Sequence, residues 1–425
     1  MDMTAGSDSS YDDELDGVLR ERSVRPVFQP VVDLDSLAVL GFEALARGPA
    51  GTALETPDQL FAAAREQGRV PELDWLCREV AVEAARSAEF RHPLSLFVNA
   101  EPHALRATAG EAQRWRSFGD LRCYTEITER ALATWPAALL RAIEQIREQD
   151  WGIALDDIGV DRLSLALMPL LRPDVLKLDM GLLRRTADRE AVRVVHAVLH
   201  QAGETGAMVV AEGIETDRQL EAARSYGVSL GQGYLLGRPA PLPVALDFPA
   251  RAVPLVDRVV DRSLAPAPFA LVTSRTPTRR LSQRAVLELA RQLLDQAVEL
   301  RPEPVVLAAV ADPALLTEGL RAGLGGAGEQ LALTAVLSST GDLDLPGVRV
   351  AGLPEGDPAR HDFDVAVISP YYAGALVARP AGTAGNWDGD TWDAALTFSR
   401  ELVAGAANAL LGRLPAERGP IAEVS

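Results

Sequence analysis

Acidic and amide side chains recur at the ends of short apolar runs in the first half of the chain. They are Glu43, Asn99, Glu126, Asp156, Asp157, Glu212 and Glu215, and Lys177 interrupts one further run. Each run is typical of a buried strand in a repeated βα pattern, and the ends of such strands converge on one face of a closed parallel barrel. Carboxylates gathered on one face repel one another unless cations neutralise them. Oxygen ligands without thiol or imidazole favour Mg²⁺ or Mn²⁺, and two such ions suit in-line attack on a phosphate ester.

Each of these residues also has a plainer interpretation as a helix cap. A single Asp or Glu at a strand end is more often the N-cap of the next helix than a catalytic group. Caps do not, however, require carboxylates at five strand ends and an ammonium group at a sixth. An unpaired charge inside a barrel is costly unless carboxylates neutralise it, so we predict that Lys177 faces the site.

Eight runs are strand candidates, and the segments between them have helical periodicity. The runs are VFQPVVDL, LGFEALAR, SLFVNAEP, CYTEITE, GIALDDIG, DVLKLDM, MVVAEGIE and GQGYLLG. The first two are joined by only a few residues around Asp35 and Ser36, which is too short for a parallel crossover. We therefore predict an α/β chain with a modified TIM (β/α)8 barrel whose first strand is antiparallel, followed by a smaller C-terminal α/β (α+β) domain.

Composition divides the chain into five segments. Residues 1–18 are acidic and have little to bury, which predicts a disordered tail. We expect the barrel at 19–245, a Pro-rich linker at 246–268, the second domain at 269–415 and a tail at 416–425. Within the second domain the pattern predicts a closing helix from about Asp393 to Leu411, and a loop for the run GLGGAG at 323–328.

Charge and composition exclude several classes of protein. With 42 basic and 60 acidic residues the net charge is -18, which argues against binding of polymeric nucleic acid. The N-terminus lacks the pattern of a secretion signal, and no run approaches roughly 18 uninterrupted apolar residues, so we expect a cytoplasmic protein without membrane contact.

Cys77 and Cys123 lack the spacing of a metal site or a disulfide framework. His196 and His200 lie at i, i+4 without the HExxH pattern, so we expect a surface or interhelix role.

The order of the motifs resembles a known family. FQPVVDL, GFEALAR, VNAEP, TEITE, ALDDIG, LKLD, AEGIET and GQGYLLGRP resemble the motifs of EAL-domain phosphodiesterases, which hydrolyse cyclic di-GMP, over about residues 22–242. The resemblance implies a barrel with one antiparallel strand, a homodimer and a two-metal site with Mg²⁺ or Mn²⁺. The metal ligands that it implies are Glu43, Asn99, Glu126, Asp156 and Asp157.

The same resemblance implies roles for further residues. Lys177 would place the attacking water or stabilise charge on the phosphate. Glu212 would lie next to that water as general base or metal ligand. The implied contacts to the cyclic dinucleotide are Gln29, Arg47, Glu215 and Gln232, and those that hold the loop after the fifth strand are Glu129 and Glu215.

The chain departs from the family after the paired aspartates. The family usually continues with a Phe-Gly-Thr-Gly-Tyr-Ser-Ser-Leu type of loop, whereas residues 158–165 read Ile-Gly-Val-Asp-Arg-Leu-Ser-Leu. In the family this loop and the helix after it couple dimerisation to ordering of the second-metal ligand, and loss of small residues at positions 160 and 161 stiffens it.

The leading hypothesis is hydrolysis of cyclic di-GMP to linear pGpG. The alternatives are a catalytically weak or inactive cyclic di-GMP receptor and a scaffold that acts through partner proteins.

The C-terminal part, about residues 262–415, more loosely resembles the DICT sensory domain. The segments that carry this resemblance are TPTRRLSQRAVLELARQLLD, VAVISPYYAGALVARP and the helix ending AANALLGRL. It implies an input module that regulates the barrel through an unknown ligand or protein.

Overall fold

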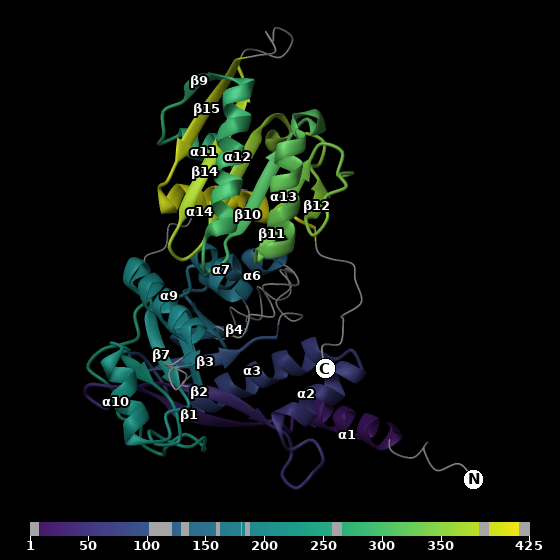
Figure 1. Ribbon diagram of the computed structural model, residues 1–425. Coiled ribbons are helices and arrows are strands. Elements are labelled where there is room, and N and C mark those ends of the chain that lie inside the picture. The colour runs from purple at the N-terminus through teal and green to yellow at the C-terminus, as the bar shows by residue number, and fades with distance from the viewer. Residues whose placement is uncertain are drawn as a thin grey trace.

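The computed structural model describes residues 8–101, 121–128, 136–158, 162–179, 181–182, 188–256, 266–381 and 391–415. The first part of the chain forms a closed eight-stranded barrel, and the second part forms a seven-stranded sheet. The two parts are stacked, with the sheet domain above the helices α6 and α7 of the barrel in the view of Figure 1.

The barrel strands follow chain order around the circumference. They are β1 (Arg25–Asp33), β2 (Val39–Arg47), β3 (Ser95–Asn99), β4 (Cys123–Thr128), β5 (Gly152–Asp156), β6 (Val175–Asp179), β7 (Met208–Glu212) and β8 (Leu230–Gly231). Strand β1 pairs antiparallel with both β2 and β8, which confirms the predicted modification of the barrel. The tight turn after β1 depends on Asp33, whose carboxylate accepts hydrogen bonds from the N–H groups of Asp35 at 3.2 Å and Ser36 at 2.8 Å.

Helices cover the outside of the barrel. They are α2 (Pro57–Glu66), α3 (Val70–Ser87), α6 (Pro136–Arg147), α7 (Arg162–Leu171), α9 (Arg189–Thr205) and α10 (Asp217–Ser225). A further helix, α1 (Asp8–Glu21), precedes β1, so the predicted disordered tail is wrong for residues 8–18. This helix forms because Leu15, Val18 and Leu19 are buried in one cluster with apolar residues of α2 and α3. No helix in the described part of the chain has the length and hydropathy needed to cross a bilayer.

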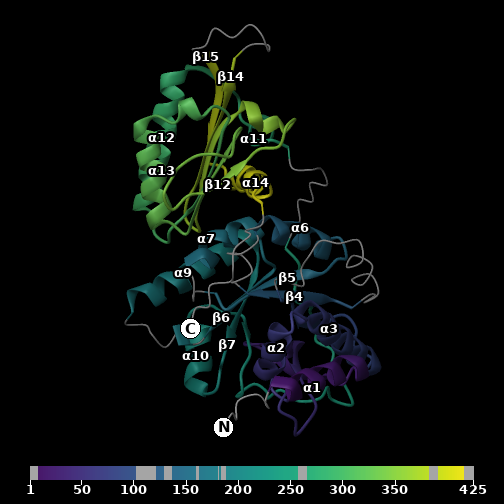
Figure 2. The same ribbon diagram turned by 90° about the vertical axis from the view of Figure 1, so that its right-hand side faces the viewer.

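The second domain has helices on both faces of its sheet. Its strands, in the order β12-β11-β10-β13-β14-β15-β9, are β12 (Arg349–Gly352), β11 (Leu333–Ser338), β10 (Val305–Val310), β13 (Phe363–Ile368), β14 (Ala373–Pro380), β15 (Thr391–Thr397) and β9 (Arg279–Ser282). Helices α12 (Gln283–Glu299) and α13 (Glu318–Gln330) lie on one face, and α11 (Pro268–Thr273) and α14 (Arg400–Leu411) lie on the other, as Figure 2 shows. Two short 3-10 helices, η2 (Pro313–Leu315) and η3 (Pro358–His361), lie in connections.

Two predictions for the second domain are wrong. The expected closing helix begins at Arg400, because residues 391–397 form β15, in which Trp392 and Ala394 alternate toward the core. The run GLGGAG is part of α13 and not a loop. Burial of Leu324 and Ala327 on that helix outweighs the low helix propensity of glycine.

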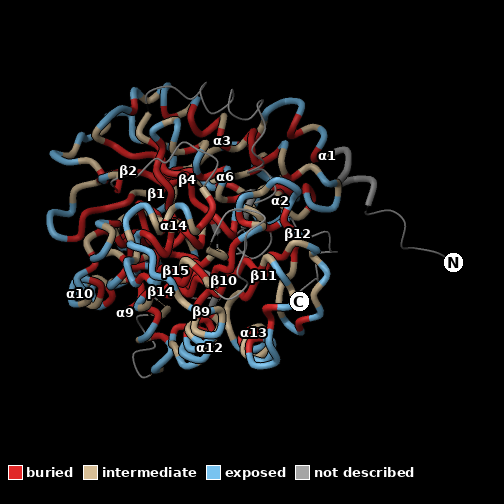
Figure 3. The backbone as a smooth tube through the Cα atoms, turned by 90° about the horizontal axis from the view of Figure 1, so that it is seen from above, coloured by how far each residue is buried: buried red, intermediate tan, exposed pale blue. Residues whose placement is uncertain are grey.

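The two parts of the molecule share one apolar core. Residues of α6 and α7 lie in the same buried cluster as Val403, Leu410 and Leu411 of α14. The Asn408 side chain of α14 also donates a hydrogen bond to the carbonyl of Leu170 in α7 at 3.1 Å. Buried residues accordingly concentrate along the middle of the molecule, while α10, α12 and α13 carry exposed faces at its periphery (Figure 3).

Candidate active site

Consecutive barrel strands deliver predicted site residues to one end of the barrel. They are Glu43 of β2, Asn99 of β3, Glu126 of β4, Asp156 of β5, Lys177 of β6 and Glu212 of β7. Lys177 is the only lysine in the chain, and all the others of its 42 basic residues are arginines. Its Nζ lies 2.8 Å from Glu212, 2.9 Å from Glu126, 3.3 Å from Asp156 and 3.4 Å from Glu43. The structure therefore brings four carboxylates around a single ammonium group.

This excess of negative charge shifts several pKa values. Burial lowers the pKa of Lys177, but the surrounding carboxylates, led by Asp156, raise it well above its usual range. Burial and the neighbouring Glu43 raise the pKa of Glu126 well above its usual range. Burial also raises the pKa of Glu212 to about 8, although Lys177 opposes this shift. The pKa of Glu43 is lowered, because Lys177 and hydrogen bonds outweigh the effect of burial. The cluster thus retains protons unless further positive charge compensates its carboxylates.

The donor set fits a hard divalent cation. Glu126 is only 1% exposed, and its carboxylate pairs with Lys177 at 2.9 Å and lies next to Glu43. Carboxylate and amide oxygens of this kind are the ligands that Mg²⁺ and Mn²⁺ prefer. In the conformation of the structure the described His, Cys, Asp and Glu residues form no group of three arranged around one cation position.

Amide side chains orient the carboxylate of Glu43. Asn99 donates a hydrogen bond to Oε1 of Glu43 at 3.1 Å, and Gln232 donates to Oε2 at 2.6 Å. The side-chain N–H of Gln232 also donates to Oε1 of Gln29 at 3.2 Å, and the side-chain N–H of Gln29 donates to the carbonyl of Gly237 at 3.0 Å. The structure thus places Gln29 and Gln232 next to Glu43.

The remaining predicted residues lie at the rim or beyond it. Asp157 is exposed, with a left-handed φ of 55°, and its N–H donates to Oδ1 of Asp156 at 3.0 Å. Glu215 is exposed before α10, where its N–H donates to the side chain of Gln219 at 2.8 Å. Its contact to a dinucleotide stays a prediction, and Glu129 lies outside the described residues.

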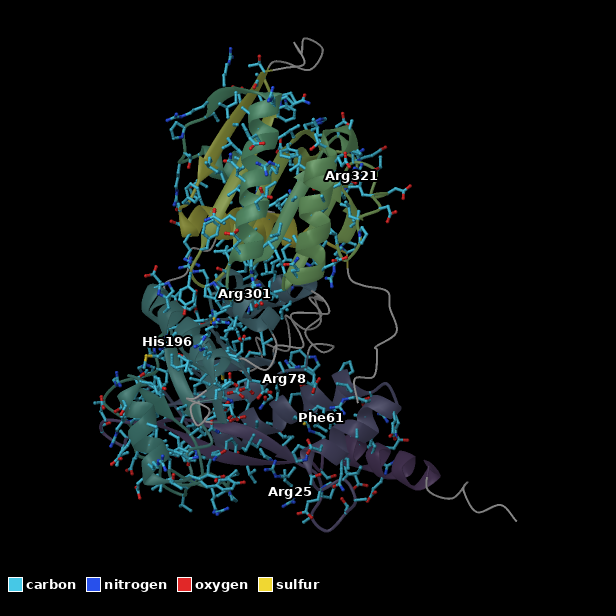
Figure 4. All side chains as sticks on the ribbon, viewed as in Figure 1. Arg25, Phe61, Arg78, His196, Arg301 and Arg321 are labelled. Carbon is cyan, nitrogen blue, oxygen red and sulfur yellow. The ribbon has the colours of Figure 1, made fainter. Side chains whose placement is uncertain are left out.

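A cavity of about 310 Å³ adjoins Glu43 between the ends of β2 and β3 and the helices α2 and α3. Arg47, Phe61 and Arg65 line it. Figure 4 shows Phe61 and Arg78 on this side of the barrel. Arg47 has its only described hydrogen bond to the carbonyl of Ala46, at 2.7 Å, and no described ion pair, so its guanidinium retains donors for an anionic ligand.

The sequence prediction missed two charged residues of this cavity. Asp74 and Arg78 of α3 form a buried ion pair, and Asp74 also accepts a hydrogen bond from the N–H of Glu101 at 3.0 Å. The available signal was an opposite-charge pair at i, i+4 on the same helix face as Ala81 and Ala85. An ion pair in the apolar stripe of a helix indicates a buried polar site.

Comparison with known proteins agrees with this geometry. The family model described as EAL domain matches residues 12–239. Cyclic di-GMP phosphodiesterase NbdA of Pseudomonas aeruginosa is 30% identical over 254 residues, which cover 57% of this chain and 32% of NbdA. Cyclic di-GMP phosphodiesterase RocR of the same species is 28% identical over 229 residues, which cover 52% of this chain and 58% of RocR.

The matched region is therefore only part of these relatives. Among solved structures, the EAL domain of Xanthomonas citri FimX in complex with c-diGMP aligns with a TM-score of 0.50 at 19% identity. The alignment covers 57% of this chain and 97% of that domain, and it supports the barrel fold alone. Because the family model covers more than half of the sequence, in agreement with the eight strands and the carboxylates at their ends, the chain belongs to the EAL domain family.

Proposed function

We propose that the barrel is a metal-dependent phosphodiesterase that hydrolyses cyclic di-GMP to linear pGpG. The observation that carries this proposal is the convergence of four carboxylates on Lys177 at one end of the barrel. Membership of the EAL domain family supports it, as do the names of NbdA and RocR as cyclic di-GMP phosphodiesterases.

The ligands of the site would be the oxygen donors at the strand ends. Glu43, Asn99, Glu126, Asp156 and Asp157 would hold two Mg²⁺ or Mn²⁺ ions. Such ions supply Lewis acidity and acidify bound water. Positive charge near Glu126 and Glu212 would also favour the ionised forms of both carboxylates, which burial disfavours.

The side chains of the chain itself would orient the reaction. Water oxygen attacks phosphorus, the bond from phosphorus to one 3′-oxygen breaks, and the product carries a 5′-phosphate and a 3′-hydroxyl group. Lys177 would keep a fixed positive charge beside the phosphate while negative charge develops on it. Glu212 lies 2.8 Å from Lys177 and would accept the proton of the attacking water. Arg47, at the edge of the cavity, would bind a phosphate oxygen.

We also propose that the second domain regulates the barrel. The contact of α14 with α7 supports this role, because α7 begins shortly after Asp156 and Asp157. The ligand or protein partner of this domain, its resemblance to DICT sensory domains, homodimer formation and the cytoplasmic location stay predictions.

A cyclic di-GMP receptor is the second candidate function. The departure from the family loop at residues 158–165 favours it, because this segment follows the exposed Asp157. Hydrolysis of cyclic di-GMP by the full chain with Mn²⁺, beside a Glu43→Ala control, distinguishes the two functions. Linear product that is lost in the control supports the phosphodiesterase, whereas binding without product supports the receptor.

A further inference from the structure

The chain beyond the last barrel strand closes the barrel at the end opposite to the carboxylates. We call residues Arg251–Val256 the floor segment. Val253 has 0% of its surface exposed and packs in the barrel interior with Phe97, Tyr124 and Val175. The segment was predicted to be a linker, and it lies outside the residues that the EAL family model matches. The described part of the predicted linker therefore packs inside the barrel and forms part of its core.

The apolar layer that the floor segment touches lies directly beneath the site. Five of its residues, one on each strand from β3 to β7, precede a site residue by two positions, and residues two apart in a strand point to the same side. The pairs are Phe97 with Asn99, Tyr124 with Glu126, Ala154 with Asp156, Val175 with Lys177 and Val210 with Glu212. A displacement of this layer would therefore move the layer of polar side chains above it.

Polar contacts fix the floor segment to the strands that carry Glu126, Asp156 and Lys177. The hydroxyl group of Tyr124 on β4 donates a hydrogen bond to the carbonyl of Val253 at 2.7 Å. The carbonyl of Pro254 is a second acceptor, 3.1 Å from the same hydroxyl oxygen. Asp174, at the start of β6, accepts hydrogen bonds from Val256 N–H at 2.8 Å and from Ile153 N–H of β5 at 2.7 Å.

The ring of Tyr124 links the floor segment to a further strand, β3. It stacks on Phe97 of β3 with a centroid distance of 4.9 Å and an interplanar angle of 18°. Tyr124 and Phe97 are both 0% exposed, and the close packing of a protein interior opposes a shift of either ring. The hydroxyl group therefore defines how deep the ring sits beneath Glu126 and Asn99.

We propose that Tyr124, held by the floor segment, is a positioning residue for the metal-binding layer of the barrel. The inference rests on the proposed function, because it assumes that Glu126 and its neighbours bind divalent cations. Tyr124 does not contact the reacting groups and acts through the placement of Glu126 and Asn99. In the sequence the floor segment comes between the barrel and the second domain.

The test is Tyr124→Phe in the full-length chain, with Tyr372→Phe as the matched control. The control also removes one tyrosine hydroxyl group, which donates to Gln296 at 3.0 Å in the second domain. Mn²⁺ binding is measured by calorimetry, and cyclic di-GMP hydrolysis is measured in parallel. We expect the Kd for Mn²⁺ to rise on the order of tenfold in Tyr124→Phe, as for other residues that support metal ligands, and to stay unchanged in Tyr372→Phe.

The dissociation constant separates positioning from a loss of stability. Partial unfolding lowers the number of binding sites but leaves the Kd of the folded fraction unchanged. If Tyr124→Phe does not fold, Val253→Ala perturbs the same layer and should raise the Kd in the same direction. An unchanged Kd in the folded variant overturns the inference even when the wild-type chain hydrolyses cyclic di-GMP. A wild-type chain that binds Mn²⁺ without hydrolysis refutes the proposed function alone.

Discussion

Replacement of Lys177 by methionine removes the ammonium group from the carboxylate cluster without a large loss of volume. Its Nζ lies within 3.4 Å of four carboxylates, and the side chain is 1% exposed. At an effective dielectric constant of about 20, each pair at about 3 Å corresponds to roughly 5 kcal/mol of gross attraction, most of which desolvation offsets. Removing one partner of a buried ion pair costs about 3–5 kcal/mol. We expect the metal-free variant to lose that much free energy of unfolding at pH 8, as measured by urea denaturation.

The loss should depend on pH in a definite direction. The pKa values of Glu126 and Glu212 are raised in the folded protein, so the folded state binds more protons than the unfolded chain does. Stability therefore falls as pH rises through these folded pKa values, and the variant should recover part of its loss between pH 8 and about pH 5. Arg291→Met is the control, since it removes a cation whose ion pairs with Glu288 and Asp295 are exposed, and should change stability little. A loss below about 1 kcal/mol that does not vary with pH would refute the electrostatic account.

Three further substitutions test other parts of the structure. Lys177→Arg should abolish most hydrolysis of cyclic di-GMP in a steady-state assay, because a planar guanidinium group does not fit the position of the compact ammonium group; activity close to wild type would contradict this. Asp33→Asn should lower the melting temperature by a few degrees at pH 7, because hydrogen bonds and Arg251 lower the pKa of Asp33 to about 2 against the opposing effect of burial. That contribution is present above the unfolded pKa and is lost as pH falls through about 2, so the difference should vanish in acid, and a constant difference in thermal scans would count against it. Leu410→Ala, in the core shared by both domains, should cost about 2–5 kcal/mol in a single cooperative denaturation transition, and two separate transitions would show that the domains unfold independently.

Residues at strand ends were predictable because barrel topology alone brings them together. Glu43, Glu126 and Lys177 are far apart in sequence, but each lies on a strand of a repeated βα pattern, whose closure into a barrel brings them together. The antiparallel first strand followed from the length of one turn. The charged residues Asp74 and Arg78 could not be predicted in this way, because they lie on a helix whose position against the barrel depends on packing.

The wrong predictions have tertiary causes. A Cβ atom on Gly328 would lie 2.7 Å from the backbone of Gly347, so this glycine of α13 permits a close approach between the helix and residue 347. Helix α1 is acidic along most of its length, and three buried apolar side chains are enough to dock it. The floor segment has the proline content of a linker, yet Val253 fills the barrel interior. Local composition does not report such long-range contacts.

We expect the carboxylates around Lys177 to form a metal-dependent hydrolytic site. The most direct test of this expectation is a single-turnover reaction of the purified full chain with cyclic di-GMP, with Mn²⁺ present and then removed by a chelator, followed by chromatography of the product. We expect linear pGpG with Mn²⁺, no product after chelation and recovery of product when Mn²⁺ is restored. Product formation that is unaffected by chelation, or bound cyclic di-GMP that stays intact with Mn²⁺, would contradict it.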